Sequence, residues 1–582
     1  MIRMPLASHY VPALADQRRP SRIRRLATTA LALGTLPMCF VAADAAAAPI
    51  HKASQPIKDS AGRTEVIVDF NFDPQTDITL NDVISNIEYK PWAGHQLKAI
   101  KFLNQFEKKY VMERSGMTSW TTTSMTAYVT SEQMQLIAKD QQVALVTENQ
   151  PQKFSSFFVA SDSIVSGSTG ESVSWGWKLT TNNNFLPAGS SERLVYVIDG
   201  GIADHADLNV FKRTNVACGT GAENCSTGMS NDEFPVVGCF PHSTHIAGII
   251  GAIGGNDKTN IGVYPGVKLV SVGVIYADGA NVGKCASSPL SVPGNPSTST
   301  IGYALDWVRK STLLRVQTLG DMRVPIVSMS VNSGEIGFDT AGQAETNRAK
   351  LSRLVAPAQQ VCAPRGYWES KVCAFVDYPG AFFVQSAGNQ TAGFNNNVTG
   401  AGRDICTEFQ QGTTGRSLAY THAYPNNGTT DPTDGVMVIG AIRPDGAAVD
   451  VSPVDRRFSD ASPSGLLTTP PTSSNYGACI DAWAPGDRIY SSWCQQYPNI
   501  MGAQSCIVGT QYSGNGTSGT QGWAFLSGTS MAAPHVAGVA AYLADSLGLT
   551  TPGSIEQAVR ARLFPTGYTD QGNNSVNIVQ VP

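Results

Sequence analysis

The stretch LVYVIDGGIADHADL, residues 194–208, opens with a continuous apolar run that ends in Asp199 and two glycines. Segments with helical spacing, such as 301–317 and 533–548, occur between or after further runs of this kind. These runs are KLVSVGVI (268–275), VPIVSMS (324–330), AFFVQSAG (381–388) and VMVIGAI (436–442). Unbroken apolar runs are typical of strands that helices cover on both faces. We therefore predict an α/β fold with a mostly parallel central sheet, whose working residues gather beyond the carboxyl ends of the strands.

The composition of the chain indicates a folded, loop-rich protein. Of its 582 residues, 42% are hydrophobic and only 15% are charged, and glycine is abundant at 56 residues. This balance disfavours a disordered chain. The net charge is −4, but residues 1–48 contribute +4, so the remainder carries −8. A chain without a basic face is not expected to bind nucleic acid.

The N-terminus has the features of a secretory signal peptide, which we place at residues 1–48. The basic stretch RRPSRIRR (18–25) precedes an apolar run (26–42) and the small residues ADAAAAP (43–49), an order typical of such signals. A membrane anchor is the alternative, but the apolar run is only about 17 residues long and contains Gly34 and Pro37. We expect a secreted protein, either extracellular or periplasmic, that has no membrane attachment once the signal is removed.

The cysteines are consistent with export. Eleven are present, and Cys39 lies in the predicted signal. The other ten all fall between Cys218 and Cys506. An even number in an exported chain favours disulfides, although the spacing leaves their pairing open. No CxxC motif occurs, which disfavours a zinc or redox site.

Residues 49–151 are predicted to form a small α+β unit of their own. Its expected elements are a strand at 64–70, a helix within 95–112, and a strand, a helix and a strand over 125–150. Thr130 and Gln133 fit a capping box at the start of the second helix. The polar, Ser-rich stretch that follows is predicted to be a linker over 152–174, and the main domain is predicted to cover 175–582.

Three polar residues lie at the end of a predicted strand or the start of a predicted helix, where their side chains could take part in a reaction. Asp199 ends a buried strand, where a carboxylate can orient a partner or simply cap a turn. His242 begins a helix with His245 three positions later, but no carboxylate follows at ligand distance, which disfavours a zinc pair. Ser530 enters an Ala-rich helix, either as an N-cap or as a nucleophile beside N–H groups that stabilise an oxyanion. The order Asp, His, Ser and the absence of a GxSxG elbow around Ser530 disfavour an α/β-hydrolase esterase.

Together these segments resemble the subtilisin-like family of serine proteases. The resemblance rests on Asp199-Gly200-Gly201, His242-Ser243-Thr244-His245 and Gly528-Thr529-Ser530-Met531-Ala532-Ala533-Pro534, in that order. Stretches at 262–274, 328–331, 386–389 and 476–486 agree with it. The family implies a subtilisin-like three-layer fold with a mostly parallel central sheet. It also implies that 49–151 is an inhibitor-type propeptide with a ferredoxin-like α+β fold.

The resemblance implies a role for each matching residue. Ser530 would be the nucleophile, His242 its base, and Asp199 the group that orients the imidazole. Asn389 would supply the oxyanion-hole amide. The residues expected to line the substrate cleft, and to pair with an extended peptide, are Ser328, Met329, Ser330, Val331, Ser386, Ala387 and Gly388. Catalysis would need no cofactor, whereas Asp207 matches a calcium ligand of some relatives, and Ala203 stands where a carboxylate is common.

Three positions depart from the family pattern. Gly200 replaces the usual Ser or Thr after the catalytic Asp, which removes a hydroxyl that supports the carboxylate. Ser243 replaces the glycine after the histidine and is small enough to be tolerated. Asn332 stands where glycine is common, at the rim of the first specificity pocket.

We therefore predict a monomeric, secreted serine endopeptidase that acts on proteins and peptides and is made as a zymogen. Its own propeptide would assist folding and inhibit the enzyme, and would then be cut off by self-cleavage within 150–172. The alternative is a catalytically silent family member that acts as a binding protein. The chain retains Asp199, His242, Ser530 and Asn389, which favours the enzyme.

Overall fold

The computed structural model of the protein describes most of the predicted elements. The described residues are 47–53, 56–71, 91–115, 124–149, 153–154, 158–160, 165–166, 172–187, 192–203, 205–216, 241–256, 260–274, 298–332, 379–389, 435–442, 474–493, 523–570 and 572–581. The predicted signal, apart from its last two residues, lies outside these ranges. Cys479 lies within them and is buried, whereas the other cysteines lie outside.

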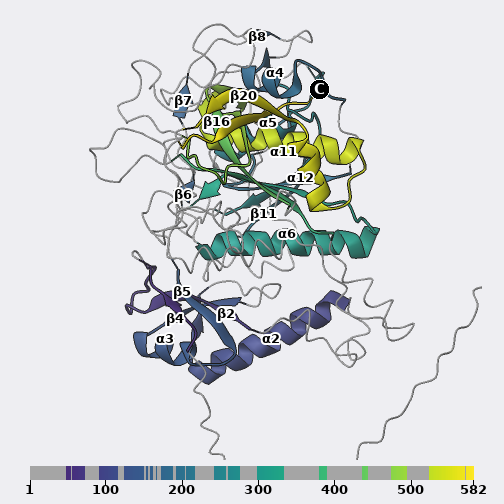
Figure 1. The fold of residues 1–582 in the computed structure, drawn as a ribbon. Helices are drawn as coiled ribbons and strands as arrows, with labels where there is room; N and C mark the ends of the chain where they lie inside the picture. Colours follow the sequence, from purple (N-terminus) through teal and green to yellow (C-terminus); the bar gives the residue numbers. More distant parts are fainter. Residues whose placement is uncertain are drawn as a thin grey trace, which may run out of the picture. The chain divides into compact units, whose positions relative to one another are not determined.

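A nine-stranded sheet forms the centre of the main domain (Figure 1). In spatial order its strands are β11 (Val210–Asn215), β12 (Lys268–Gly273), β10 (Leu194–Asp199), β13 (Ile326–Met329), β15 (Phe382–Ser386), β16 (Val436–Ile442), β17 (Ala482–Pro485), β21 (Ser575–Val579) and β20 (Leu563–Thr569). Every neighbouring pair is parallel except β20 with β21. All five apolar runs are strands of this sheet, which confirms the predicted α/β fold.

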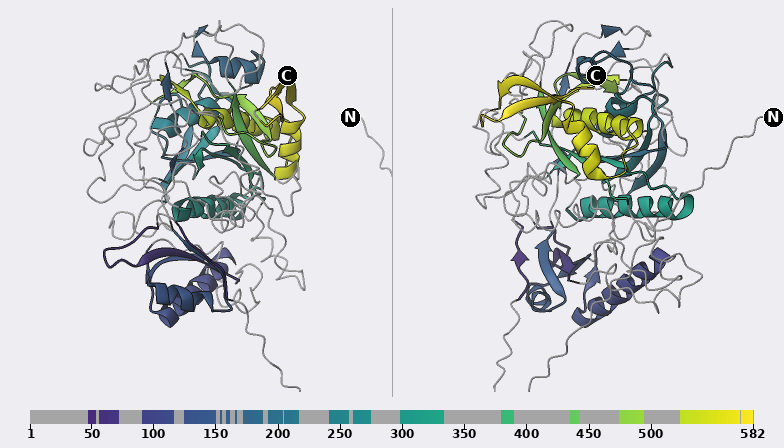
Figure 2. Two further views of the ribbon diagram at one scale, coloured as in Figure 1. Left: turned by 60° about the vertical axis from the view of Figure 1, so that its left-hand side comes forward. Right: turned by 45° about the vertical axis from the view of Figure 1, so that its right-hand side comes forward.

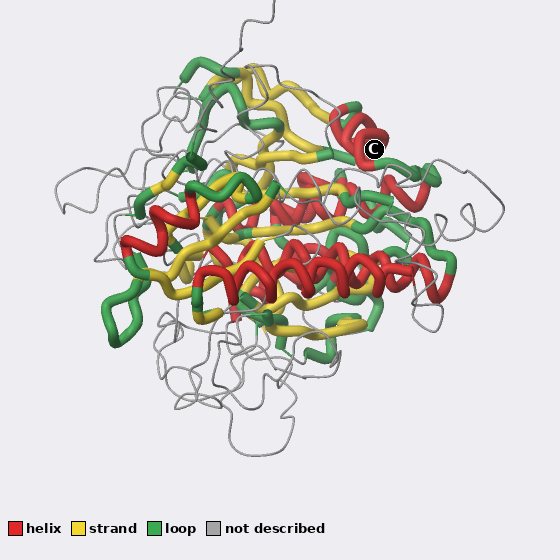
Figure 3. Tube along the Cα trace, turned by 90° about the horizontal axis from the view of Figure 1, so that it is seen from below, coloured by secondary structure: helices red, strands yellow, loops and turns green. Residues whose placement is uncertain are grey.

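Helices cover both faces of the sheet. Along β10, Val195 and Val197 join an apolar cluster with α5 (Pro241–Gly251) and α11 (Thr529–Ser546). Tyr196 and Ile198 point the other way and join a second cluster with α6 (Thr298–Leu319). Figure 2 shows α6 and α11 on opposite sides of the strands, and Figure 3 shows the helices and strands overlapping in a view from below. The continuous hydrophobicity of β10 therefore reflects two buried faces.

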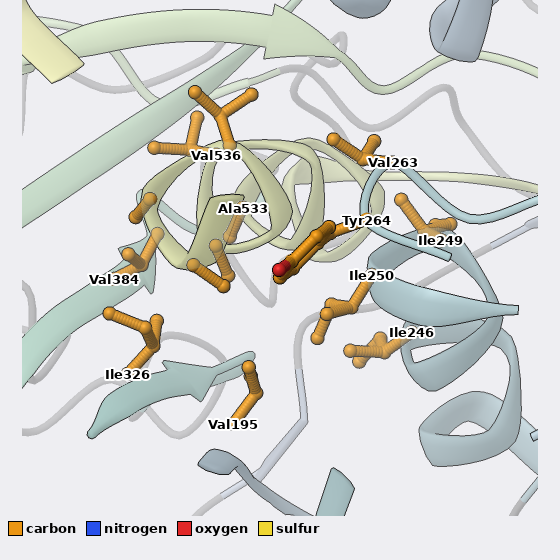
Figure 4. Close-up of a cluster of buried hydrophobic side chains, with 14 of the residues drawn as sticks. Val195, Ile246, Ile249, Ile250, Val263, Tyr264, Ile326, Val384, Ala533 and Val536 are labelled. Atoms are coloured by element: carbon orange, nitrogen blue, oxygen red, sulfur yellow. The ribbon is translucent and has the colours of Figure 1, made fainter. Parts of the chain in front are cut away.

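Glycines let α5 and α11 pack closely against their neighbours. A Cβ atom at Gly248 would lie 2.3 Å from Ser491 Oγ, and one at Gly251 would lie 2.5 Å from Val267 Cγ1. A Cβ atom at Gly538 of α11 would lie 2.7 Å from Val263 Cβ and 3.2 Å from the carbonyl oxygen of Ile250. Figure 4 shows how the aliphatic side chains of this cluster fill the space between the strands and the two helices. The close packing at these three positions thus depends on glycine, which has no side chain.

The N-terminal unit has a sheet of its own. Its strands, in spatial order, are β1 (Ile50–His51), β5 (Val143–Glu148), β2 (Thr64–Phe70), β4 (Ser124–Val129) and β3 (Glu113–Arg114). The helices α2 (Pro91–Tyr110) and α3 (Ser131–Ala138) supply Leu103, Phe106 and Met134 to its core. The capping box predicted at Thr130 and Gln133 is present.

Among its described residues, the range predicted as a linker contains four short strands. They are β6 (Lys153–Phe154), β7 (Phe158–Ala160), β8 (Val165–Ser166) and β9 (Ser172–Val173). β8 and β9 pair with each other. β6 pairs with β14 (Val331–Asn332), and β7 pairs with β19 (Trp523–Ser527), both antiparallel. Within the described ranges, none of the helices has both the length and the hydropathy needed to cross a membrane.

His535 of α11 is held neutral by its surroundings. Its side chain is buried, and its Nδ1–H donates to the backbone oxygen of Met531 at 2.8 Å. On the other side, α4 (Trp175–Thr181) packs so closely that a Cβ atom at Gly176 would lie 2.8 Å from His535 Nε2. Burial lowers the pKa of His535 to about 4, while the Met531 hydrogen bond acts in the opposite direction. We assign His535 a structural role.

Replacement of Gly538 by alanine is expected to destabilise the protein. Helix propensity alone would stabilise the helix by about 1 kcal/mol. However, the new Cβ meets Val263 Cβ and a backbone oxygen, which are not flexible side-chain ends. We therefore expect a net loss of about 1–3 kcal/mol, measured by thermal unfolding in a Ser530→Ala background, which lacks the predicted nucleophile. Gly254→Ala is the control, because its Cβ would meet no atom closer than 3.4 Å; equal stability of the two variants would contradict the packing argument.

Acidification is expected to destabilise the fold through His535. The pKa is about 4 in the folded state and about 6.5 when unfolded, so the unfolded chain binds the proton more readily. The stabilisation is present above pH 6.5 and is lost as the pH falls, by about 3 kcal/mol at pH 4. Denaturant unfolding at several pH values, in the same Ser530→Ala background, should show a shallower pH dependence for His535→Gln. If the free energy of unfolding depends on pH equally in both proteins, His535 is not the cause of the acid destabilisation.

Candidate functional site

Asp199 is placed by the end of β10. The strand pairs with β12 on one side and β13 on the other, and Asp199 lies opposite Gly273. The backbone N–H of Val274 donates to the Asp199 carbonyl at 2.9 Å. The side chain is fully buried. A buried carboxylate is costly unless hydrogen-bond donors meet it, and the donors here come from α5 and from the turn after β10.

His242 faces this carboxylate from the first turn of α5. Its Nδ1 lies 3.0 Å from Asp199 Oδ2 and 3.1 Å from Oδ1. An ionised carboxylate can only accept, so Nδ1 carries the proton and Nε2 is left as the basic nitrogen. This is the tautomer that a general base for a hydroxyl requires. The helix begins at Pro241, whose missing N–H costs nothing in a first turn.

Two further donors hold Asp199 Oδ1. The backbone N–H of Gly200 donates at 2.7 Å, and the hydroxyl of Ser243 donates at 2.6 Å. Ser243 is fully buried as well. From its small size, Ser243 was expected only to be tolerated in place of glycine, and this contact was not predicted. Its position directly after His242 was the available signal.

Ser530 occupies the first turn of α11, after Gly528 as N-cap residue. It is buried, and its Oγ has no hydrogen-bond partner among the described residues. The hydroxyl of Ser330, just beyond β13, donates to the Ser530 backbone oxygen at 3.4 Å. The first-turn N–H groups of a helix lack intrahelical partners, so a negative charge that develops beside them is stabilised.

Asn389 is tied to the turn that carries Ser530. Its Oδ1 accepts the N–H of Thr529 at 2.7 Å, and the Thr529 hydroxyl accepts the N–H of Gly388 at 3.1 Å. Because the oxygen end of the amide is fixed in this way, its other end is an NH₂ donor. Gly388 has φ +92°, a conformation that favours glycine. The structure therefore brings the predicted Asn389 beside the start of α11.

Asn475 supports this turn and was missed by the sequence analysis. Its Nδ2 donates to the Ala387 carbonyl at 2.8 Å, and its backbone N–H donates to the Gly388 carbonyl at 2.9 Å. Both Asn475 and Ala387 are buried. Nothing in the sequence around Asn475 signalled the contact, since the two segments are far apart in the chain.

The residues predicted to line the substrate cleft divide into two groups. Ser328 and Met329 lie inside β13, between β10 and β15, and Met329 belongs to the apolar cluster on the α6 face. The prediction that Met329 lines a cleft is therefore wrong, because its side chain is part of the core. Ser330 and Val331 lie beyond the end of β13, where the backbone of β14 pairs with β6. Ser386 ends β15, and Ala387 and Gly388 follow it in the turn to Asn389.

The described residues around Asp207 do not fit a calcium site. Calcium takes six to eight oxygen ligands. Asp207 is fully buried, but Oδ1 accepts from Asn256 Nδ2 at 3.0 Å and Oδ2 accepts the Asn260 N–H at 3.3 Å. No cluster of three or more His, Cys, Asp or Glu side chains suited to a metal occurs in the described part of the chain. Both oxygens of the Asp207 carboxylate thus accept hydrogen bonds from nitrogen donors, whereas a calcium ligand would direct them at the ion.

His245 does not form a metal pair with His242. Its Nε2–H donates to the carbonyl of Ile489 at 3.0 Å, and its own carbonyl accepts the Ser491 hydroxyl at 2.7 Å. The residue is fully buried. These contacts join α5 to β18 (Ile489–Ser492), which agrees with a structural role.

Known proteins share stretches of this chain. "Subtilisin-like protease 2" of Pseudogymnoascus destructans is 31% identical over 169 residues, which are 28% of this chain and 36% of that protein. "Cuticle-degrading protease" of Metarhizium anisopliae is 34% identical over 104 residues, 18% of this chain and 20% of that protein. "Alkaline serine exoprotease A" of Vibrio alginolyticus is 35% identical over 104 residues, 18% of this chain and 15% of that protein. The matches span about a third or less of these relatives.

The fold also matches a solved structure. Fervidolysin from Fervidobacterium pennivorans, described as a keratinolytic enzyme related to subtilisin, superposes with a TM-score of 0.53 at 15% identity. The match covers 92% of this chain and 62% of that one. At this identity it supports the subtilisin-like α/β fold alone. The model of the subtilase family (peptidase S8) matches residues 190–577. This range is more than half of the chain and includes Asp199, His242 and Ser530, so the protein belongs to the subtilase family.

Proposed function

We propose that the protein is a secreted serine endopeptidase that hydrolyses peptide bonds in proteins and is made as a self-processed zymogen. The observation that carries the proposal is the pairing of His242 Nδ1 with the buried Asp199 carboxylate at 3.0 Å. Ser530 stands at the start of α11, the helix that packs against α5. The membership of the subtilase family supports the same activity.

In the proposed reaction, Ser530 Oγ attacks the carbonyl carbon of the scissile bond while His242 Nε2 takes its proton. The tetrahedral intermediate collapses, the C–N bond breaks, and the imidazolium gives its proton to the leaving amine. Water then attacks the acyl-enzyme, again with His242 as base, and Ser530 regains its proton. Asp199 keeps the tautomer and stabilises the imidazolium, and it stays ionised throughout.

The negative oxygen of each intermediate needs donors aimed at it. The NH₂ group of Asn389 is the proposed side-chain donor, because its Oδ1 is already engaged by Thr529 N–H at 2.7 Å. The backbone N–H of Ser530, in the first turn of α11, is the proposed second donor. Donors fixed before the reaction cost no reorganisation when the charge develops.

Substrates are proposed to bind by strand addition. An extended segment of the chain itself, β6, pairs antiparallel with β14 directly after β13. A second segment, β7, pairs antiparallel with β19, and Phe158 lies opposite Ser527, three residues before Ser530. Main-chain hydrogen bonds of this kind give affinity for any extended peptide. Ser330, Val331, Ala387 and Gly388 are the proposed lining, and Ser328 and Met329 are not part of it.

The same pairing suggests where self-cleavage occurs. β6 ends at Phe154 and pairs with β14, and β7 begins at Phe158 and pairs with β19, the strand that precedes Ser530. The Asn149 side chain, just before them, donates to Ser299 Oγ at 3.0 Å at the start of α6. We propose that the processed bond lies between Phe154 and Phe158, that residues 49–151 are the propeptide, and that the mature enzyme is a monomer that acts outside the cytoplasm. Disulfides among the ten remaining cysteines would suit that location.

A catalytically silent family member is the competing proposal. It would keep the fold and bind peptides at β14 without cutting them. The retained Asp199–His242 pair argues against it, because a silent protein gains nothing from a buried, correctly tautomerised histidine. The calcium that some relatives bind is not part of the proposal, since the residues at Asp207 do not fit it.

The Ser530→Ala variant is expected to accumulate a precursor that retains residues 60–150, because the attacking oxygen is missing. Expression in a host without related proteases and intact-mass measurement of the product would show it. The wild type should begin between residues 155 and 158, and its Ser530 should react with a fluorophosphonate. Ser546→Ala, with a hydroxyl at the far end of the same helix, is the control and should be processed normally. Normal processing of Ser530→Ala would overturn the zymogen proposal, and a wild type without a Ser530 adduct would favour the silent protein.

Removal of the Asn389 amide is expected to lower kcat about 10²–10³-fold with little change in KM. That range is the one measured for the corresponding donor in subtilisin itself. Asn389→Asp is the matched variant, since it keeps an acceptor for Thr529 N–H and replaces the NH₂ donor with an oxygen. Both Asn389→Ala and Asn389→Asp should lose kcat on a peptide substrate. If Asn389→Asp keeps full activity, the amide serves only to support the Thr529 turn.

A further inference from the structure

We propose that Ser243 is a positioning residue of the active site, which holds the Asp199 carboxylate in the orientation that His242 needs. The proposal rests on the proposed protease function and adds a member to its machinery. Ser243 donates from Oγ to Asp199 Oδ1 at 2.6 Å. It touches neither substrate nor the reacting atoms, so it acts through Asp199.

The geometry gives the carboxylate a fixed frame. Gly200 N–H reaches Oδ1 from the turn directly after Asp199, and Ser243 Oγ reaches the same oxygen from the first turn of α5. His242 Nδ1 bridges both oxygens, at 3.0 Å from Oδ2 and 3.1 Å from Oδ1. Without Ser243, Gly200 N–H would be the one described donor other than His242 that holds the carboxylate against rotation about its Cβ–Cγ bond. The Ser243 hydroxyl supplies a second donor from another element and fixes that rotation.

The position of Ser243 makes the frame rigid on both sides. Ser243 follows His242 directly in α5, so the hydroxyl and the imidazole are displaced together if the helix shifts. The imidazole and the hydroxyl therefore both reach the carboxylate from the same helix, α5. Gly200 has no side chain and cannot provide a hydroxyl from the β10 side. The hydroxyl that supports Asp199 thus comes from the residue after the histidine instead of the residue after the aspartate.

Burial makes this hydrogen bond strong. Asp199, His242 and Ser243 are all fully buried, so water does not compete for the carboxylate. Hydrogen bonds to an ionised acceptor are shorter and stronger than neutral ones, and the 2.6 Å distance agrees with that class. A buried charge also needs its acceptor sites occupied. A Ser243 hydroxyl that served only the helix would bond within α5, whereas its hydrogen bond goes to Asp199.

Thr244 provides a matched control in the same helix turn. Its Oγ1 accepts the N–H of Ala203 at 3.0 Å, so it also ties α5 to the turn after β10. It makes no contact of this kind with the Asp199 carboxylate. Thr244→Val keeps the shape and removes the hydroxyl. It therefore tests whether any loss in Ser243→Ala comes merely from a looser connection between α5 and this turn.

The test compares purified mature wild type, Ser243→Ala, Thr244→Val and the double variant Gly200→Ser/Ser243→Ala. Active enzyme is counted with a fluorophosphonate, and kcat and KM are measured on one peptide substrate. We expect Ser243→Ala to lose kcat about ten- to hundredfold, the factor that a hydrogen bond to a charged group is worth, with KM nearly unchanged. Thr244→Val should keep kcat within about twofold of wild type. Gly200→Ser should restore part of the kcat, because φ at Gly200 is not positive and a serine there can offer a hydroxyl to the same carboxylate.

A second measurement does not depend on turnover. The His242 Nδ1 proton that is bound to a carboxylate should give a low-field proton NMR resonance, which should shift in Ser243→Ala and stay in place in Thr244→Val. The proposal fails if Ser243→Ala keeps kcat within about twofold, if Thr244→Val loses as much, or if Gly200→Ser restores nothing. Failure of the protease function itself looks different, because the wild type would then neither react with the fluorophosphonate nor cleave the peptide.

Discussion

The hydrogen bonds that converge on the buried Asp199 carboxylate are the interaction on which the site depends. A charge at the carboxyl end of a central strand is tolerated only if donors reach it, and they come from Gly200, His242 and Ser243. Two of the three belong to α5. The carboxylate therefore binds the start of α5 to the end of β10, and the same contacts that satisfy the buried charge also set the tautomer of His242. The same hydrogen bonds therefore stabilise the buried charge and orient His242.

The position of Ser530 depends on a different constraint, the close approach of α11 to α5 and to the sheet. Gly538 lets α11 approach Val263 and the Ile250 backbone, and Gly248 makes room for the serines of β18. At the start of α11, Thr529 joins Gly388 and Asn389 by hydrogen bonds that cross from one strand end to a helix. The proposed nucleophile, base and oxyanion donor thus come from segments far apart in the chain, which glycine packing and short hydrogen-bonded contacts hold together.

Much of this arrangement was readable in the sequence, because its signals are local. Continuous apolar runs identify strands buried on both faces, and the residues that follow them are expected at one edge of a parallel sheet, as Asp199 and Asn389 are. The face of the sheet to which a side chain points is not signalled by a local motif. Met329 lies next to the site in sequence but faces α6, since neighbouring residues in a strand point to opposite faces. Ser243 was judged by size alone, and its partner is 44 residues away. Asn475 lies 88 residues from Ala387 and carries no motif.

The pairing of β6 and β7 explains how a polar stretch that reads as a linker can contain short strands. Strand addition uses main-chain groups, so a Ser-rich sequence with little periodicity can pair as well as an apolar one. Substrates are proposed to use the edges of β14 and β19, so the segment that pairs with both strands would occupy the proposed substrate site. On that proposal, the chain would block its own site through backbone pairing, without a dedicated inhibitory side chain. The proposed cut between Phe154 and Phe158 would leave β6 and β7 each next to a new chain end, and neither short strand has a core of its own to keep it in place.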